Sequence, residues 1–205
     1  MLNLAEAFQT TSLVSKYNGI KSNVIEVFSM KVYLIRHSEP TYQQATDAGL
    51  QGFGRELGGL TENGVTIAQK LAQQPLFEHV QLILASPYTR ALQTALEIVR
   101  FNDIPLKVEL GLREWQPDNT GLRTDTDEQA SVAYQLYRQH AGQRVADSPL
   151  HYETAAEVKS RVLTTLSKYA QTYDCIACVT HGEVMQQFGD RQDVVFCGVR
   201  EIIVD

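Results

Sequence analysis

Apolar and polar positions along the chain follow two patterns, one typical of buried strands and one typical of amphipathic helices. Five short runs rich in β-branched residues have the length and composition of buried strands. These runs occupy residues 31–35, 80–85, 106–109, 175–179 and part of 194–204. Segments with the spacing of amphipathic helices lie between them. Because strands that alternate with helices form parallel sheets, the pattern predicts an α/β fold with a mostly parallel central sheet.

Four helices are expected, and capping residues indicate where several of them begin. The helices span about residues 62–73, 86–99, 128–140 and 154–169. Thr61 precedes the first helix. In the second, Ser86 is a favourable N-cap and Pro87 suits the first helical position. Thr154 and Glu157 form the pattern of a capping box, which opens the fourth helix.

The chain is expected to form a single domain over residues 30–205, because its length and apolar content suit one core. Residues 1–29 are expected to be a leader, or an added helix around residues 4–14, outside this core. The glycine-rich segment 49–59, which carries Arg55, is typical of a mobile loop. No internal repeat or low-complexity linker divides the sequence.

Composition and charge narrow the classes of partner. The 205 residues carry a formal net charge of -6, which disfavours binding to nucleic acid or to an anionic membrane through a broad basic face. No apolar run approaches the roughly 20 residues that span a bilayer, and the first residues lack the pattern of a secretory signal. Three cysteines are too few for a disulfide framework. We therefore expect a soluble cytoplasmic protein in which an anionic ligand meets a local positive site.

Cys175 and Cys178 form a C-x-x-C pair, which in other contexts is redox-active or half of a zinc site. Here both lie within the apolar run of residues 175–179. Positions three apart on a strand point to opposite faces, whereas a redox pair normally opens a helix. We therefore interpret the two cysteines as buried strand residues.

Polar side chains with catalytic potential follow the predicted strands. Arg36 and His37 come directly after the first strand, and Arg90 lies shortly after the second. Glu114 lies beyond the third strand, and His181 follows the fourth. Ligands of open α/β sheets bind beyond the carboxyl ends of the strands, so these five residues are expected on one rim. A structural histidine or a solvated arginine would explain each residue singly, but not their convergence.

These residue types match the chemistry of phosphoryl transfer. The planar guanidinium group of an arginine can donate hydrogen bonds to two phosphate oxygens at once, so Arg36 and Arg90 would hold a phosphate dianion. His37 would attack phosphorus as a neutral imidazole if its other nitrogen donates to a backbone carbonyl. His181, when protonated, would add another donor. Glu114 would protonate the leaving oxygen and then activate water, which requires a pKa raised toward neutrality.

At these residues the sequence resembles the histidine phosphatase superfamily, also called the phosphoglycerate mutase-like family. The motifs LIRHSEP, LTENG, SPYTRALQTA, LREW and VTHGEV occur in that family's order, and the likeness extends over residues 30–205. The resemblance implies a three-layer α/β/α sandwich and a phosphohistidine intermediate on His37. It implies a phosphate pocket of Arg36, Arg90 and His181, with Glu114 as the acid. It also implies that no metal and no cofactor take part.

Three further residues are candidate substrate contacts. Ser38 stands where the family's Arg-His-Gly motif has glycine, next to the nucleophile. Gln43 stands where many mutase-like members have asparagine, an amide of different reach. Arg55 lies in the glycine-rich segment, and Tyr42 and Trp115 are further candidates for the substrate entrance.

The expected reaction is hydrolysis of a small phosphomonoester, so the expected partner is a small phosphorylated metabolite. A phosphoglycerate mutase would pass the same phosphoryl group to a second substrate hydroxyl. The segment of residues 121–152 is polar, and it is shorter than the corresponding insertion that helps to seal the active site in the family's glycolytic mutases. We therefore expect water to reach the site. A low-turnover phosphate-binding regulatory module is an alternative from another class, but such a module needs only the cations and not Glu114. The sequence leaves the substrate and the oligomeric state open.

Overall fold

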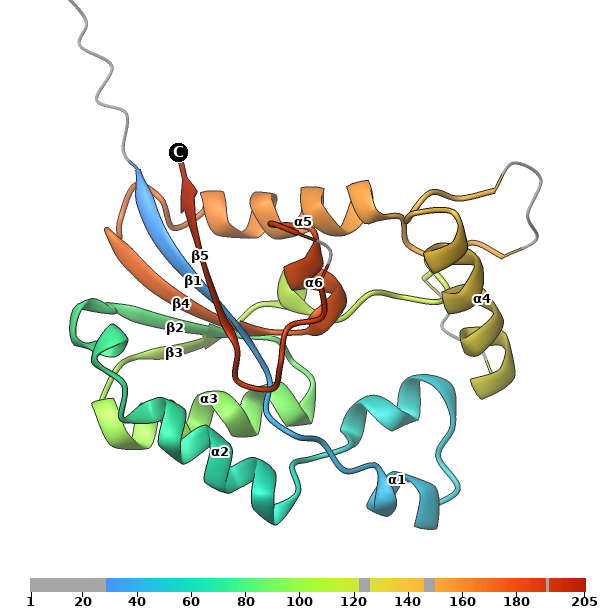
Figure 1. The fold of residues 1–205 in the computed structure, drawn as a ribbon, viewed down its shortest axis with the longest axis horizontal. Helices are drawn as coiled ribbons and strands as arrows, with labels where there is room; N and C mark the ends of the chain where they lie inside the picture. The colour runs from blue at the N-terminus through green and yellow to red at the C-terminus, as the bar shows by residue number, and fades with distance from the viewer. Residues whose placement is uncertain (1–28, 122–125, 146–149, 191) are drawn as a thin grey trace, which may run out of the picture.

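The computed structural model describes residues 29–121, 126–145, 150–190 and 192–205 (Figure 1). At its centre is a five-stranded sheet with the order β3-β2-β4-β1-β5. The strands are β1 (Met30–Arg36), β2 (Leu82–Ala85), β3 (Leu106–Val108), β4 (Cys175–Thr180) and β5 (Val199–Val204). β5 pairs antiparallel with β1, and the remaining pairs are parallel. The predicted α/β fold with a mostly parallel sheet is confirmed. The predicted leader, up to residue 28, lies outside the described residues.

Helices cover both faces of the sheet. The α-helices are α1 (Gln43–Asp47), α2 (Glu62–Ala72), α3 (Thr89–Asn102), α4 (Asp127–Gln139), α5 (Ala155–Ser167) and α6 (Gly182–Gln186). Short 3-10 helices are η1 (Gly52–Leu57), η2 (Pro75–His79) and η3 (Leu110–Leu112). Figure 1 shows α2 and α3 on one face of the sheet and α5 on the other, while α4 stands apart from the sheet. The three-layer sandwich implied by the family resemblance is therefore confirmed.

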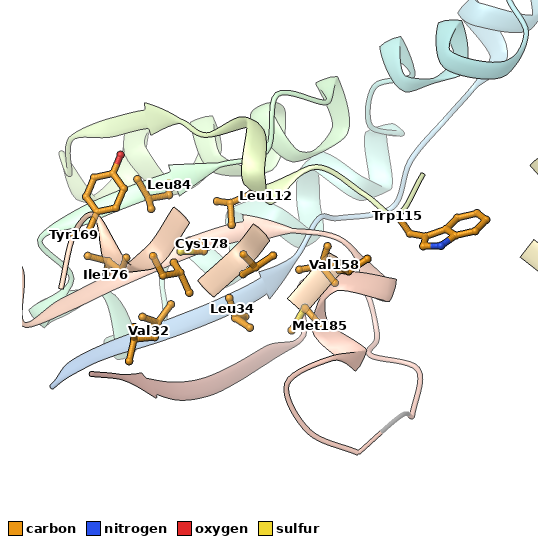
Figure 2. Close-up of a cluster of buried hydrophobic side chains, with 14 of the residues drawn as sticks. Val32, Leu34, Leu84, Leu112, Trp115, Val158, Tyr169, Ile176, Cys178 and Met185 are labelled. Carbon is orange, nitrogen blue, oxygen red and sulfur yellow. The ribbon is translucent and has the colours of Figure 1, made fainter. Parts of the chain in front are cut away.

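Two buried clusters hold these layers together, one on each face of the sheet. Alternate residues of β1 divide between them, as the two-residue period of a strand requires. Val32 and Leu34 belong to the cluster beneath α5, which Figure 2 shows with Cys178 and Met185. Ile35 belongs to the cluster beneath α2 and α3.

Cys175 and Cys178 follow the same alternation on β4. Cys175 belongs to the cluster beneath α2 and α3, and Cys178 to the cluster beneath α5. Both are buried free thiols. The interpretation of this pair as strand residues on opposite faces is confirmed.

The predicted helix starts at Thr61 and Thr154 are confirmed. The Thr61 hydroxyl accepts a hydrogen bond from the Gly64 amide, and Thr154 and Glu157 form a capping box. The predicted start at Ser86 and Pro87 is wrong, because α3 begins only at Thr89. The Ser86 hydroxyl accepts instead from the amide of Tyr88 in the turn before the helix.

Two other predicted segments have these bounds in the structure. The last strand, predicted over part of residues 194–204, spans Val199–Val204, and Cys197 before it has a φ of 57°, which interrupts extended backbone. The glycine-rich segment 49–59, predicted to be a loop, contains the 3-10 helix η1. Within the described part of the chain, no helix is long and apolar enough to cross a bilayer.

Candidate active site

The parallel pairing of β1 with β4 places two histidines side by side. Arg36 and Thr180, the last residues of these strands, are partners in the register, and the His37 amide donates to the Thr180 carbonyl at 2.9 Å. The next residues are His37 on one strand and His181 on the other. Their ring centroids are 5.1 Å apart. The predicted convergence of these two residues at the strand ends is therefore present in the fold.

The His37 imidazole is held in one orientation and is almost fully buried, with 5% of its surface exposed. Its Nδ1 lies 2.7 Å from the Ser38 carbonyl oxygen, so Nδ1 carries the hydrogen and Nε2 carries the lone pair. The Arg90 Nε donates to that lone pair at 3.3 Å. Burial, and then the charge of Arg90, lower the pKa of His37 to about 3. The ring is consequently neutral across the physiological pH range.

Two guanidinium groups flank the histidines. Arg36 donates through Nη1 to the Val194 carbonyl, and its guanidinium lies 4.6 Å from the centre of the Phe196 ring. Its buried Nε has no hydrogen-bond partner among the residues that the structure describes. Arg90, the second residue of α3, is buried and forms a 2.7 Å ion pair with Glu56 through Nη1. Both arginines therefore offer donors to an anion, and Arg90 already holds a carboxylate.

His181 lies behind this pair and is fully buried. Its Nε2 is 2.7 Å from the Ser86 hydroxyl oxygen, and its Nδ1 has no partner among the described residues. Burial, and then the charge of Arg90, hold the pKa of His181 well below its usual value. These surroundings therefore favour a neutral ring. A neutral ring still carries one N–H, which is one donor fewer than a protonated ring would supply.

Glu114 enters the site from the segment after η3. The Thr180 hydroxyl donates to the Leu112 carbonyl at 2.8 Å, which ties this segment to the end of β4. The Trp115 amide donates to Glu114 Oε1 at 2.8 Å, and Arg161 donates to the Glu114 carbonyl. Burial raises the pKa of Glu114 to about 7. This is the range in which a carboxyl group gives up and takes back a proton at neutral pH.

A cavity of about 600 Å³ opens beside these groups. Its lining residues are Arg36, Tyr42, Gly52, Arg55, Glu56, Arg90, Glu114, Trp115, Pro117, Asp127, Ala130, Ser131, Tyr134, Gly182, Glu183, Gln186, Asp193 and Val194. His37 and His181 lie beneath this wall rather than in it. Arg90 covers the lone pair of His37, so a phosphate that draws Arg90 toward its oxygens would expose the nucleophilic nitrogen.

The predicted substrate contacts divide into two groups. Arg55, Tyr42 and Trp115 line the cavity. Ser38 does not, because its hydroxyl points at the Gly64 carbonyl, 2.6 Å away. Gln43 does not either, because its side chain is exposed on α1 and donates to Asp47 at 2.7 Å. Their predicted positions at the substrate are therefore corrected.

Four acidic residues of the cavity, Glu56, Asp127, Glu183 and Asp193, were not predicted from the sequence. Glu56 pairs with Arg90, and Asp127 pairs with Arg55 at 2.7 Å. Glu183 follows His181 by two positions and is 7% exposed. Its place directly after a strand was an available signal. Glu56 and Asp127 had no such signal, because an acidic residue in a polar segment usually faces solvent.

The described residues contain no group of three or more His, Cys, Asp or Glu side chains that could hold a metal ion. The positive charge beside the histidines comes from Arg36 and Arg90. Arginine keeps its charge at any physiological pH and matches the oxygens of a phosphate group. The arrangement can thus bind a phosphoryl group, present a neutral imidazole nitrogen and exchange a proton through Glu114.

Comparison with protein-family models gives a match over residues 32–190, to the histidine phosphatase superfamily (branch 1). The chain belongs to this superfamily. The resemblance seen in the motifs is therefore confirmed, and the matched range contains all five residues of the predicted rim. A search of curated proteins finds no match for this superfamily member.

Solved structures with the same fold include phosphatases. A mycobacterial glucosyl-3-phosphoglycerate phosphatase is 18% identical, with a TM-score of 0.64 over 85% of this chain and 90% of that one. Bacillus stearothermophilus YhfR is 22% identical, with a TM-score of 0.64 over 86% and 92% of the two chains. A mutant phosphoserine phosphatase from Entamoeba histolytica, in complex with phosphoserine, is 22% identical, with a TM-score of 0.57 over 84% and 89%. At these identities the likeness establishes the shared fold.

Proposed function

We propose that this histidine phosphatase superfamily member is a metal-independent phosphomonoesterase that works through a phosphohistidine on His37. The observation that carries the proposal is the His37 ring. It is neutral, its lone pair is on Nε2, and that nitrogen lies 3.3 Å from an arginine of the cavity. A neutral nucleophile beside fixed positive charge suits attack on an anionic phosphoryl group. The proposed substrate is a small phosphorylated metabolite, which fits a cavity of this size.

In the first step His37 Nε2 forms a bond to phosphorus while the bond to the ester oxygen breaks. Arg36 and Arg90 hold the phosphoryl oxygens, and His181 donates one hydrogen bond to them. The leaving oxygen takes its proton from Glu114. The products of this step are a phosphohistidine, a free alcohol and the Glu114 carboxylate.

In the second step water attacks the same phosphorus. The Glu114 carboxylate accepts a proton from this water as the new P–O bond forms and the P–N bond breaks. Inorganic phosphate leaves, His37 is neutral again and Glu114 is protonated again. Atoms and protons balance over the cycle. A carboxyl group with a pKa of about 7 can serve as the acid in one step and the base in the other.

The test is hydrolysis of p-nitrophenyl phosphate and a panel of phosphomonoesters in the presence of a chelator. His37→Ala should lower kcat by at least about a thousandfold, because the covalent route is lost. His79→Ala is the matched control, since His79 is an exposed residue of η2 and should leave kcat unchanged. Activity that survives His37→Ala, or that depends on added magnesium, would refute the mechanism. Turnover only of phosphoglycerate with a bisphosphate primer would indicate a mutase.

We also propose a cytoplasmic location. Its support is that the three cysteines are free thiols, as expected in a reducing compartment.

A further inference from the structure

The cavity has an acidic wall, formed by Tyr134, Glu183, Gln186 and Asp193, that the proposed reaction does not use. All four side chains line the cavity, and they come from α4, α6 and the segment after α6. Gln186 donates to Asp193 at 2.9 Å. Glu183 and Gln186 are the buried members of the wall, and Glu183 is the one of these two that carries a charge. Glu183 also has a buried oxygen without a hydrogen-bond partner among the described residues.

The two oxygens of the Glu183 carboxylate are used unequally. Oε1 accepts from the Tyr134 hydroxyl at 2.7 Å and from Arg138 at 3.2 Å. Oε2 is buried and has no hydrogen-bond partner among the described residues. A buried carboxylate oxygen without a donor is unfavourable in the folded protein. Because the terminal torsion of a glutamate side chain is soft, rotation about it can turn Oε2 toward a donor in the cavity.

This carboxylate lines the same cavity as Glu114. The charge of Glu183 contributes to the raised pKa of Glu114, the proposed acid that touches the leaving oxygen. Tyr134, bonded to Glu183, packs against Trp115 with ring centroids 5.6 Å apart, and Trp115 directly follows Glu114. A leaving group bonded to the oxygen at Glu114 can therefore extend toward the acidic wall.

The charges of the cavity favour a cation in that position. Arg36 and Arg90 are engaged by the phosphate of the substrate, and Arg55 is neutralised by Asp127. Arg138 approaches Glu183 from outside the lining, at Oε1. Arg138 offsets part of the Glu183 charge, so the acceptors left for the leaving group are Oε2 of Glu183 and the Asp193 carboxylate. A carboxylate on the leaving group would meet like charges there, whereas an ammonium group would meet an acceptor.

We propose that Glu183 accepts a hydrogen bond from a protonated amine of the leaving group, so that phosphorylated amino alcohols are the preferred substrates. The assignment rests on the proposed phosphatase function and adds to it a class of substrate and the residue that selects it. Phosphomonoesters with an anionic leaving group should be the poorest substrates.

Three phosphomonoesters with leaving groups of similar size test the charge preference. O-phosphoethanolamine carries an amine, propyl phosphate is neutral and phosphoglycolate carries a carboxylate. In the wild-type protein kcat/KM should fall in that order, with about 10-fold to 100-fold between the amine and the neutral ester, as for a hydrogen bond to a charged group. Equal values for the three, or a preference for phosphoglycolate, would overturn the proposal without any variant.

Glu183→Gln keeps the shape of the side chain and an acceptor for Tyr134 and Arg138, but removes its charge. Assayed about one pH unit below the Glu114 pKa of about 7, where Glu114 stays largely protonated, it should lower kcat/KM for O-phosphoethanolamine by about 10-fold or more and leave propyl phosphate and p-nitrophenyl phosphate within about twofold. Glu201→Gln is the matched control, because Glu201 of β5 pairs with Lys31 of β1 outside the cavity. An equal loss on all esters would show a purely structural role and refute the assignment. Failure of the folded wild-type protein to hydrolyse p-nitrophenyl phosphate would instead refute the phosphatase function itself.

Discussion

At the scale of single residues, the site depends on which group holds a proton. The pKa of His37 is lowered to about 3 and that of Glu114 is raised to about 7, and burial is the first cause of both shifts. Burial disfavours the charged form of each group, which is the cation for histidine and the anion for glutamate. Both groups are thus kept neutral between these two values. A neutral nucleophile and a protonated acid are the forms that the first step requires.

The pH dependence of the reaction should follow from the Glu114 carboxyl group. The acid form is present below its pKa, so kcat/KM for propyl phosphate should fall as the pH rises above about 7, by about tenfold per unit. Glu114→Gln should lose this limb of the profile and lower kcat by about 100-fold to 10,000-fold. A second limb near pH 6, from ionisation of the substrate's own phosphate, should appear in both proteins. A basic limb that persists in Glu114→Gln would assign it to another group.

At the scale of elements, η1 joins two parts of the molecule across the cavity. Its Arg55 pairs with Asp127 of α4, and its Gly52 amide donates to the same carboxylate at 2.9 Å. Its Glu56 pairs with Arg90 of α3. This 3-10 helix therefore connects α4 to the other side of the cavity. It also pairs the Glu56 carboxylate with Arg90, an arginine that would bind the phosphate of the substrate. A bound phosphate must replace Glu56 or share Arg90 with it.

Removing the charge of Glu56 should strengthen the binding of phosphate. Glu56→Gln should lower the inhibition constant of inorganic phosphate by an amount on the order of tenfold, because Arg90 no longer has to leave a charged partner. Glu97→Gln is the control, since Glu97 pairs with Arg100 of α3 and accepts from Gln69 of α2, away from the cavity. Competitive inhibition of p-nitrophenyl phosphate hydrolysis measures the constant. A weaker binding of phosphate would show that Glu56 serves to position Arg90.

The start of α5 should contribute measurably to the stability of the fold. The Thr154 hydroxyl accepts from the Glu157 amide, and the Glu157 side chain accepts from the Thr154 amide. Thr154→Ala should lower the free energy of unfolding by about 1 kcal/mol, the usual value of an N-cap. Thr164→Ala, on the exposed side of the same helix, should have no destabilising effect. Urea titration of the two variants gives the comparison, and equal stabilities would contradict the capping role.

At the scale of the whole molecule, the sequence predicts two kinds of feature. One kind recurs with the regular period of a strand or helix, and the other follows from the position of a residue at the end of a strand. The period of the apolar residues gives the sheet, and the rule that ligands bind beyond parallel strands brings His37, His181 and Arg90 together. Ser86 was misplaced because its hydroxyl serves the turn and His181 rather than a helix start. Glu56 was missed because its contact with Arg90 joins segments 34 positions apart, which no local pattern encodes.

The pairing of β1 with β4 has a further consequence for how such a site can change. Adjacent strands lie about 4.8 Å apart, and this spacing is fixed by backbone hydrogen bonds rather than by side chains. The two imidazoles stand on neighbouring strands of that ladder, held by the register of Arg36 with Thr180. Much of the cavity wall, in contrast, comes from η1, α4 and α6. Substitutions in the wall can therefore retune which molecules are accepted while the spacing of the histidines stays constant.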